Sequence, residues 1–112
     1  MLKQAIVINS SLRMGKGKIA AHAAHASLQA YLESPKSVSS EWLSNGAKKV
    51  VLKAREEEML DLFRKAKAEG LTASIIYDAG FTQVPAGSLT AIAIGPNEEV
   101  LVDKICGHLK LV

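Results

Sequence analysis

The sequence predicts one α/β domain over residues 1–112, with three α/β/α layers and a mixed four-stranded sheet that carries helices on both faces. Two observations predict this fold. Short, continuous apolar runs such as Ala5-Ile6-Val7-Ile8 are typical of strands buried on both faces. These runs alternate along the chain with helical stretches, as they do in α/β proteins. A length of 112 residues suits one hydrophobic core and is too short for two.

The first half of the chain is predicted to contain two strands and two helices. Residues 3–9 form a buried strand, and residues 10–16 form the loop that follows it. A helix that begins near residues 15–17 and ends near residue 33 is rich in alanine, the strongest helix former. After a break at Ser34-Pro35, a short polar helix covers residues 36–44 and a second strand covers residues 48–53.

The second half begins with a helix over residues 55–70, acidic in its first turn and basic later, as the helix dipole favours. Strands over residues 72–77 and 91–94 follow, and the short connection between them allows an antiparallel pair, which makes the sheet mixed. Gly95-Pro96-Asn97 is expected to end the fourth strand. A final helix over residues 98–106 is expected to be capped by Asn97 and to turn Val100, Leu101 and Ile105 inward. Residues 109–112 form either a short terminal strand or an ordered tail.

Composition and charge limit the function classes. The apolar runs are far shorter than the ~20 residues that a membrane span needs, and the single cysteine, Cys106, cannot form an intrachain disulfide. Residues 1–55 contain nine Lys or Arg and two Glu, a net charge of +7, whereas residues 56–112 have a net charge of −4. A basic first half favours an anionic partner, although solvated surface lysines are the alternative.

The stretch from Arg13 to Ser27 combines a glycine- and lysine-rich turn with the start of a helix. Gly15-Lys16-Gly17-Lys18 offers backbone N–H groups, the positive end of a helix dipole and two ammonium groups, which are the parts of an anion site. It matches neither a Walker A loop nor a dinucleotide-binding fingerprint, and an ordinary turn with solvated lysines is the alternative.

Asp78 directly follows the apolar run of the third strand. Ligands of such sheets gather beyond the carboxyl ends of strands, so the loop over residues 10–18 and the loop after Asp78 are predicted to build one site. An acid beside a cationic helix start is placed as a general base or positioning carboxylate would be, although turn-initiating aspartates are common. Thr82, Gln83, Ser88 and Thr90 add neutral donors and acceptors.

His22 and His25 share one helix face, being three residues apart. A zinc site would need a further protein ligand, and no pattern supplies one, so no metal is predicted. Either histidine could act as a base, a donor or a substrate contact, and either could instead be a packed core residue.

Four segments resemble peptidyl-tRNA hydrolases of the archaeal/eukaryotic type (type 2). They are Met14 to Ala21 with His25 and Ala26, Asp78 to Gly80 with Thr82, Gln83, Gly87, Ser88 and Thr90, Ile94 to Pro96, and Gly107 to Leu111. Each segment alone is a weak signal, but the four agree with the family in order and spacing across nearly the whole chain.

The resemblance implies an enzyme, usually dimeric and without a cofactor, that hydrolyses the ester between a peptide and the terminal ribose of tRNA. It implies catalytic roles for the residues that match the family's functional positions, Lys18, His25, Asp78, Thr82 and Thr90. The substrate-binding residues expected around them are Arg13, Gly15, Lys16, Gly17, His22, Phe81 and Gln83. Lys16 and Arg13 would hold acceptor-stem phosphates, and water would attack the ester with Asp78, alone or with His25, as its base.

Some positions depart from the family pattern. Glutamine is common in the family where this chain has His22, and arginine is common where it has Phe81. A charged tRNA contact at position 81 would be replaced by stacking on the terminal bases. Eukaryotic relatives often carry a membrane-anchoring extension, and this chain begins one strand before the motif, as a stand-alone cytoplasmic enzyme would.

Two alternatives from other classes stay open at this stage. One is a non-catalytic RNA- or phosphate-binding module on the same scaffold, for which Asp78 would serve no purpose. The other is a small-ligand-binding regulatory domain, which would require a site too narrow for a tRNA end.

Overall fold

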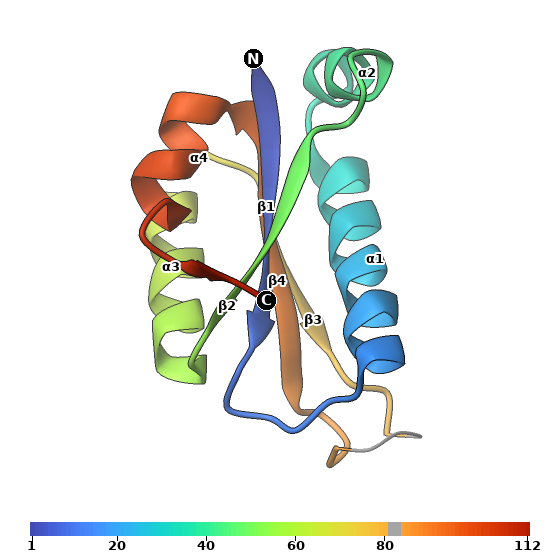
Figure 1. The fold of residues 1–112 in the computed structure, drawn as a ribbon. Coiled ribbons are helices and arrows are strands. Elements are labelled where there is room, and N and C mark those ends of the chain that lie inside the picture. The colour runs from blue at the N-terminus through green and yellow to red at the C-terminus, as the bar shows by residue number, and fades with distance from the viewer. Residues whose placement is uncertain (81–83) are drawn as a thin grey trace.

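A computed structural model describes residues 1–80 and 84–112 (Figure 1). Their helices and strands are β1 (Leu2–Asn9), α1 (Lys16–Glu33), α2 (Lys36–Ser44), β2 (Lys49–Ala54), α3 (Glu56–Ala68), β3 (Ala73–Tyr77), β4 (Leu89–Glu98), α4 (Glu99–Cys106) and β5 (Lys110–Leu111). Helices α1 and α2 lie on one side of the sheet, and α3 and α4 lie on the other. The predicted α/β fold with helices on both faces is therefore confirmed. No helix in the described ranges is both long and apolar enough to cross a bilayer.

The sheet has the strand order β3-β4-β1-β2-β5 over the described residues. β1 and β2 are parallel, and the other neighbours are antiparallel, so the predicted mixed sheet and the antiparallel β3–β4 pair are confirmed. The predicted number of four strands is wrong, because β5 adds a fifth at the β2 edge. β5 has only two residues, and so short a segment cannot be told from an ordered tail by its own sequence pattern.

Two hydrophobic clusters of described residues fill the space between the layers. The larger one lies between the sheet and α3 and α4, and includes Val7, Leu62 and Ile92. The smaller one lies under α1, where Ile6, Ile8 and alanines of α1 and β4 meet. Because alanine side chains are small, α1 packs close to β4, and this closeness positions the polar residues at the start of the helix.

β4 and α4 differ in detail from their predictions. Gly95 does not end β4: it adopts φ of 92° beside a register shift in the β1 pairing, and the strand continues to Glu98. A Cβ on Gly95 would lie 2.6 Å from the Lys3 carbonyl oxygen, so glycine is needed there. α4 has no side-chain cap from Asn97 and buries Val102, Ile105 and Cys106, whereas Val100 is 79% exposed.

Candidate active site

The carboxyl ends of β1 and β3 lie at the same edge of the sheet, because both strands run antiparallel to β4. The loop after β1 leads into α1 at this edge, and β4 begins there (Figure 1). The predicted meeting of the residue 10–18 segment with Asp78 is confirmed by one contact. The Nζ atom of Lys18 donates a hydrogen bond of 2.6 Å to Oδ1 of Asp78.

The Lys18–Asp78 ion pair is buried. The Lys18 side chain is 5% exposed and the Asp78 side chain is fully covered. The second carboxylate oxygen of Asp78 accepts a hydrogen bond of 2.8 Å from the Gly80 backbone N–H. Gly80 has φ of 99°, which only glycine adopts readily, so this residue shapes the turn that satisfies Asp78. Burial strengthens the pair, because little water screens the two charges.

His22 completes the cluster, one helical turn after Lys18. Its Nδ1 atom lies 2.7 Å from Oγ1 of Thr90, and its Nε2 atom lies 3.4 Å from Nζ of Lys18. Both His22 and Thr90 are buried. The family resemblance ranked His25 as catalytic and His22 as a substrate contact, whereas the structure brings His22, and not the exposed His25, against Lys18.

The contacts of His22 define its protonation. An ammonium group only donates, so Nε2 must accept from Lys18 and Nδ1 must carry the proton, which it donates to Thr90. The Thr90 hydroxyl donates in turn to the Ile76 carbonyl oxygen, 3.3 Å away. The pKa of His22 is lowered, first by burial, then by the charges of Lys18 and His25, while Asp78 raises it. Neutral His22 is therefore the form that fits this site at pH 7.

The remaining predicted residues on α1 and its preceding loop lie outside this buried cluster. Arg13, Gly15, Lys16 and Gly17 are exposed, at the position expected for contacts with phosphates. His25 is also exposed, and its ring lies edge-on to that of His22 with 5.5 Å between centroids. Phe81, Thr82 and Gln83 fall outside the described residues, so their predicted roles stay predictions.

Asn9 is a buried polar residue at the same end of the sheet that its sequence context did not single out. It is buried at the end of β1, and its side-chain N–H group donates to the Leu89 carbonyl oxygen at 2.8 Å and to Glu56 at 3.0 Å. Its Oδ1 atom accepts from the Ser11 backbone N–H at 2.8 Å. Asn9 thus ties the loop before α1 to the start of β4 and of α3. The sequence feature that could have pointed to Asn9 is its position as the polar residue that directly follows the apolar run of β1.

Within the described part of the chain, neither a metal-type group of ligands nor a reactive thiol accompanies this cluster. Across residues 1–80 and 84–112, no three His, Cys, Asp or Glu side chains gather as a protein metal site would require. Cys106 is buried in the larger core, and burial raises the pKa of its thiol to about 12. The thiol therefore stays protonated and unreactive near neutral pH.

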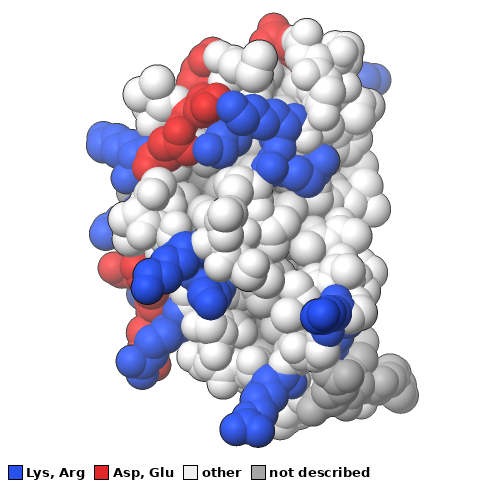
Figure 2. Space-filling view, in the orientation of Figure 1, with Lys and Arg blue, Asp and Glu red and all other residues white. Residues whose placement is uncertain are grey.

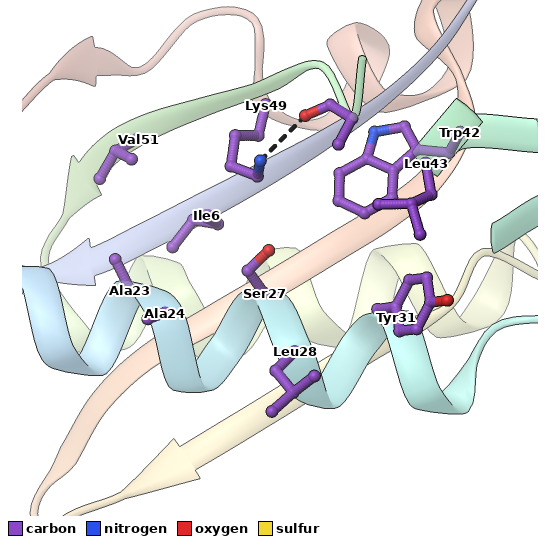
Figure 3. A pocket seen from close by; sticks show the side chains of 11 residues that line it. Ile6, Ala23, Ala24, Ser27, Leu28, Tyr31, Trp42, Leu43, Lys49 and Val51 are labelled. Atoms are coloured by element: carbon purple, nitrogen blue, oxygen red, sulfur yellow. Dashed lines mark hydrogen bonds between the residues drawn. The ribbon is translucent and has the colours of Figure 1, made fainter. Parts of the chain in front are cut away.

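A separate apolar groove of about 540 Å³ runs beside the polar cluster, between α1, α2 and β2. Figure 3 shows Leu28, Tyr31 and Leu43 along it, with Trp42 at one end and Ala23 toward the other. Its one charged lining residue, Lys49, donates to the Ala47 carbonyl oxygen at 2.9 Å. The groove holds no carboxylate and no histidine, so it is not the place for acid–base chemistry.

Comparison with known proteins decides the family. The sequence model of the family "Peptidyl-tRNA hydrolase PTH2" matches residues 2–112. The chain belongs to the PTH2 family. Three proteins named peptidyl-tRNA hydrolase illustrate the similarity. The one from Methanococcus maripaludis is 52% identical with all of both chains covered, and the one from Methanocaldococcus jannaschii is 49% identical over 99% of this chain and all of its own. The one from Methanothermobacter thermautotrophicus is 41% identical over the same shares.

The match to the PTH2 family covers residues 2–112 and therefore includes every described residue of the cluster. The Lys18 and His22 side chains come from α1, and Asp78 and Thr90 come from the β3–β4 end of the sheet. The resemblance drawn from four sequence segments is thereby confirmed, since the matched region runs from one end of the chain to the other.

Proposed function

We propose that this chain hydrolyses the ester bond of peptidyl-tRNA and so returns free tRNA and peptide during translation. The observation that carries the proposal is the buried Lys18–Asp78 ion pair at the start of α1. It places one cation and one carboxylate where an exposed, basic helix start can hold an RNA end. Membership of the PTH2 family supports the same activity.

In this reaction a water molecule attacks the ester carbonyl carbon, and negative charge develops on the carbonyl oxygen. The ammonium group of Lys18 stabilises that charge, and one such donor typically contributes about 3 kcal/mol. The attacking water passes a proton to the site, with Asp78 as the acceptor. The bond to the ribose oxygen then breaks, and this oxygen takes up the proton held by Asp78, which gives a ribose hydroxyl. The peptide carboxylic acid formed at the same time loses the second water proton to solvent and becomes a carboxylate.

The contacts of Lys18 support a positioning role for its neighbours. Asp78 and neutral His22 fix two of the three N–H directions of the ammonium group. Thr90 orients the His22 ring, and its own hydroxyl hydrogen points to the Ile76 carbonyl oxygen. In this proposal Thr90 holds the His22 ring in place and does not contact the substrate. The group that donates a hydrogen bond to the developing oxyanion is Lys18.

Substrate binding falls to the exposed residues around the cluster. Arg13 and Lys16 hold phosphates of the tRNA acceptor end, and Gly15 and Gly17 allow its backbone to approach the helix start. His25, exposed beside His22, is kept from the family resemblance as a catalytic residue that assists Asp78. Roles in catalysis for Thr82, and in binding for Phe81 and Gln83, complete the proposal from the family resemblance.

The deciding experiment measures release of the acyl group from an N-acetylated aminoacyl-tRNA by the purified protein, with and without a chelator. We expect hydrolysis that the chelator does not change. Lys18→Ala and Asp78→Asn should each lower kcat by at least about a hundredfold, as loss of oxyanion or acid–base help does. Lys36→Ala, an exposed change on α2, is the control and should leave kcat unaltered.

A non-catalytic RNA-binding module is the rival. It predicts tRNA binding with no release of the acyl group, and near-normal binding by Asp78→Asn. The buried carboxylate disfavours this rival, since a site that only binds phosphate gains nothing from a fixed negative charge beside its lysine.

The proposal also includes a homodimer that works in the cytoplasm, where translation takes place. A dimer needs an apolar surface, and three leucines supply one beside the α1–α2 groove. Leu28 is 57% exposed, Leu32 is 65% exposed and Leu43 is 55% exposed. We place the dimer contact on this face, and it leaves the start of α1 open to tRNA.

A further inference from the structure

Basic side chains without acid partners gather beyond the candidate active site. Figure 2 shows Lys and Arg side chains over both the upper and the lower part of one face, while Asp and Glu side chains lie at its top, beside the upper basic group and along its left margin. Two of the basic residues, Lys53 and Lys110, belong to β2 and β5. Among the described residues, neither has an acid within ion-pair distance, unlike Lys3, Lys48 and Lys104, which pair with acids at 2.7–2.8 Å.

Lys53 and Lys110 are directly opposite each other in the antiparallel β2–β5 pair. Like charges at such positions repel and destabilise a sheet. β5 contributes only two residues to the sheet, so this edge has few other contacts to offset the repulsion. An anion bound between the two ammonium groups would remove the repulsion, and this is the first argument for a ligand here.

The register of the sheet connects this pair to the active site. Lys110 pairs with Lys53, Lys53 with Ile8, and Ile8 with Ala91, which directly follows Thr90. Paired residues share a face, and Ile8 and Ala91 lie on the α1 face. Three strand spacings of ~4.8 Å separate Ala91 from Lys110, a distance of about 14 Å. A nucleic-acid strand covers a distance of this order in a few nucleotides.

A hollow of about 520 Å³ lies beside the pair and is lined by Lys53, Arg55 and Lys110. The acid in its lining, Glu58, is already engaged, because its carboxylate lies 2.9 Å from Nε2 of His108. Arg55 lies 3.8 Å from Glu57, but both side chains are 79% exposed, and such an exposed pair is weak. The lining is therefore basic overall and open to an anionic chain. Arg13, in the loop after β1, and Lys16, the first residue of α1, are both exposed, and this loop starts at Ser10, which also lines the hollow.

We propose that Lys53, Lys110 and Arg55, the β2–β5 basic edge, form a second phosphate-binding surface that holds the tRNA backbone a few nucleotides before its 3′ end. The inference rests on the proposed function, since the ester to be cleaved fixes the 3′ end at Lys18. Polyanionic RNA is favoured over an acidic protein segment because the hollow also borders Ser10, the first residue of the loop that leads to the exposed Arg13 and Lys16 at the start of α1. The edge thereby distinguishes a tRNA ester from a free aminoacyl ester.

The test compares the double variant Lys53→Glu/Lys110→Glu with the control Lys36→Glu/Arg64→Glu. The control makes the same charge change at two exposed residues for which, in the described ranges, no ion pair is found. Each protein is assayed with N-acetyl-aminoacyl-tRNA and with N-acetyl-aminoacyl-adenosine, which carries the same ester without the upstream phosphates.

For the tRNA substrate we expect the double variant to raise KM about tenfold or more, with kcat within about twofold of the unaltered protein. The slope of log KM against log salt concentration should flatten by about two, one for each lost phosphate contact. The adenosine substrate should be cleaved equally by both proteins. An unchanged KM for tRNA, an equal rise in the control, or an equal loss with the adenosine substrate would overturn the inference.

Folding is separated from binding by the single variant Lys53→Glu. It places opposite charges across β2 and β5, so its Tm should not fall, while its KM for tRNA should still rise. A KM that rises only in variants with a lowered Tm would overturn the inference. Hydrolysis of neither substrate by the unaltered protein would instead refute the proposed function, so the two failures are distinguishable.

Discussion

Lys18 is held by a negative charge on one side and by a neutral ring on the other. Protonation of His22 would place a cation 3.4 Å from the Lys18 ammonium and would remove the acceptor that Nε2 provides. The His22 pKa is lowered mainly by burial and by Lys18, so the folded protein binds this proton less readily than the unfolded chain does. Stability linked to His22 is therefore fully present above about pH 6.5 and is lost as pH falls below it.

The corresponding prediction compares His22→Gln with His25→Gln. Glutamine can accept from Lys18 and donate to Thr90 as neutral His22 does, but it does not titrate. We expect the free energy of unfolding of His22→Gln to fall less between pH 7.5 and 5.5 than that of the unaltered protein, measured by urea unfolding. His25→Gln changes an exposed ring and should keep the original pH dependence. Equal pH dependence in all three proteins would contradict this account of His22.

At the residue scale, the sequence was enough to predict that Lys18 and Asp78 lie together. It was not enough to predict which other side chains contact them. Lys18 and Asp78 are 60 residues apart, and the expectation that their loops share an edge needed only the direction of two strands. The preference for His22 over His25 in contacting Lys18 depends on the rotation of α1 about its axis. The contacts of Asn9 depend on three segments that are distant in sequence. Neither can be obtained from local spacing.

Gly17 and Gly70 show how the local backbone conformation determines the effect of a glycine-to-alanine substitution on stability. Gly17 lies in the first turn of α1, and a Cβ there would meet nothing within 4 Å. Gly70 follows α3, also has open space around its Cβ position, and adopts φ of 79°. Both positions have space for a methyl group, so they differ only in backbone conformation.

We expect Gly17→Ala to stabilise the fold by up to about 1 kcal/mol, which raises Tm by roughly 4 °C. Gly70→Ala should destabilise it by about 1 kcal/mol, because alanine is strained at positive φ. Thermal unfolding followed by circular dichroism measures both. Because the added methyl group lies where the tRNA backbone is proposed to approach, KM for tRNA should rise while Tm increases. A lowered Tm for Gly17→Ala would contradict the open geometry at this turn.

Elements with a strong local pattern were predicted well, and those with a weak one were not. The alanine-rich α1 and the apolar cores of β1, β3 and β4 follow from composition and period. The extension of β4 through Gly95 and the addition of β5 depend on pairing with β1 and β2. Pairing partners set these boundaries, so the local sequence around residues 95–98 and 110–111 could not reveal them.

At the scale of the whole molecule, the polar site and the apolar groove occupy different flanks of α1. Lys18 and His22 face Asp78 and Thr90 at the β3–β4 side. Ala24, Leu28 and Tyr31 face the groove beside α2 and β2. One helix can therefore serve catalysis and association at once, and a change on the second flank need not disturb the first.

The dimer proposal is tested by Leu32→Glu/Leu43→Glu, which places two charges on the apolar face beside the groove. Light scattering coupled to size-exclusion chromatography should give the mass of a dimer for the unaltered protein and of a monomer for this variant, because burying unpaired carboxylates in an apolar contact is strongly unfavourable. Val100→Glu is the control, since Val100 is 79% exposed on α4, across the sheet from the groove. We expect it to stay dimeric. An unaltered protein of monomer mass, or a Leu32→Glu/Leu43→Glu variant that stays dimeric, would place the association of this chain elsewhere or exclude it.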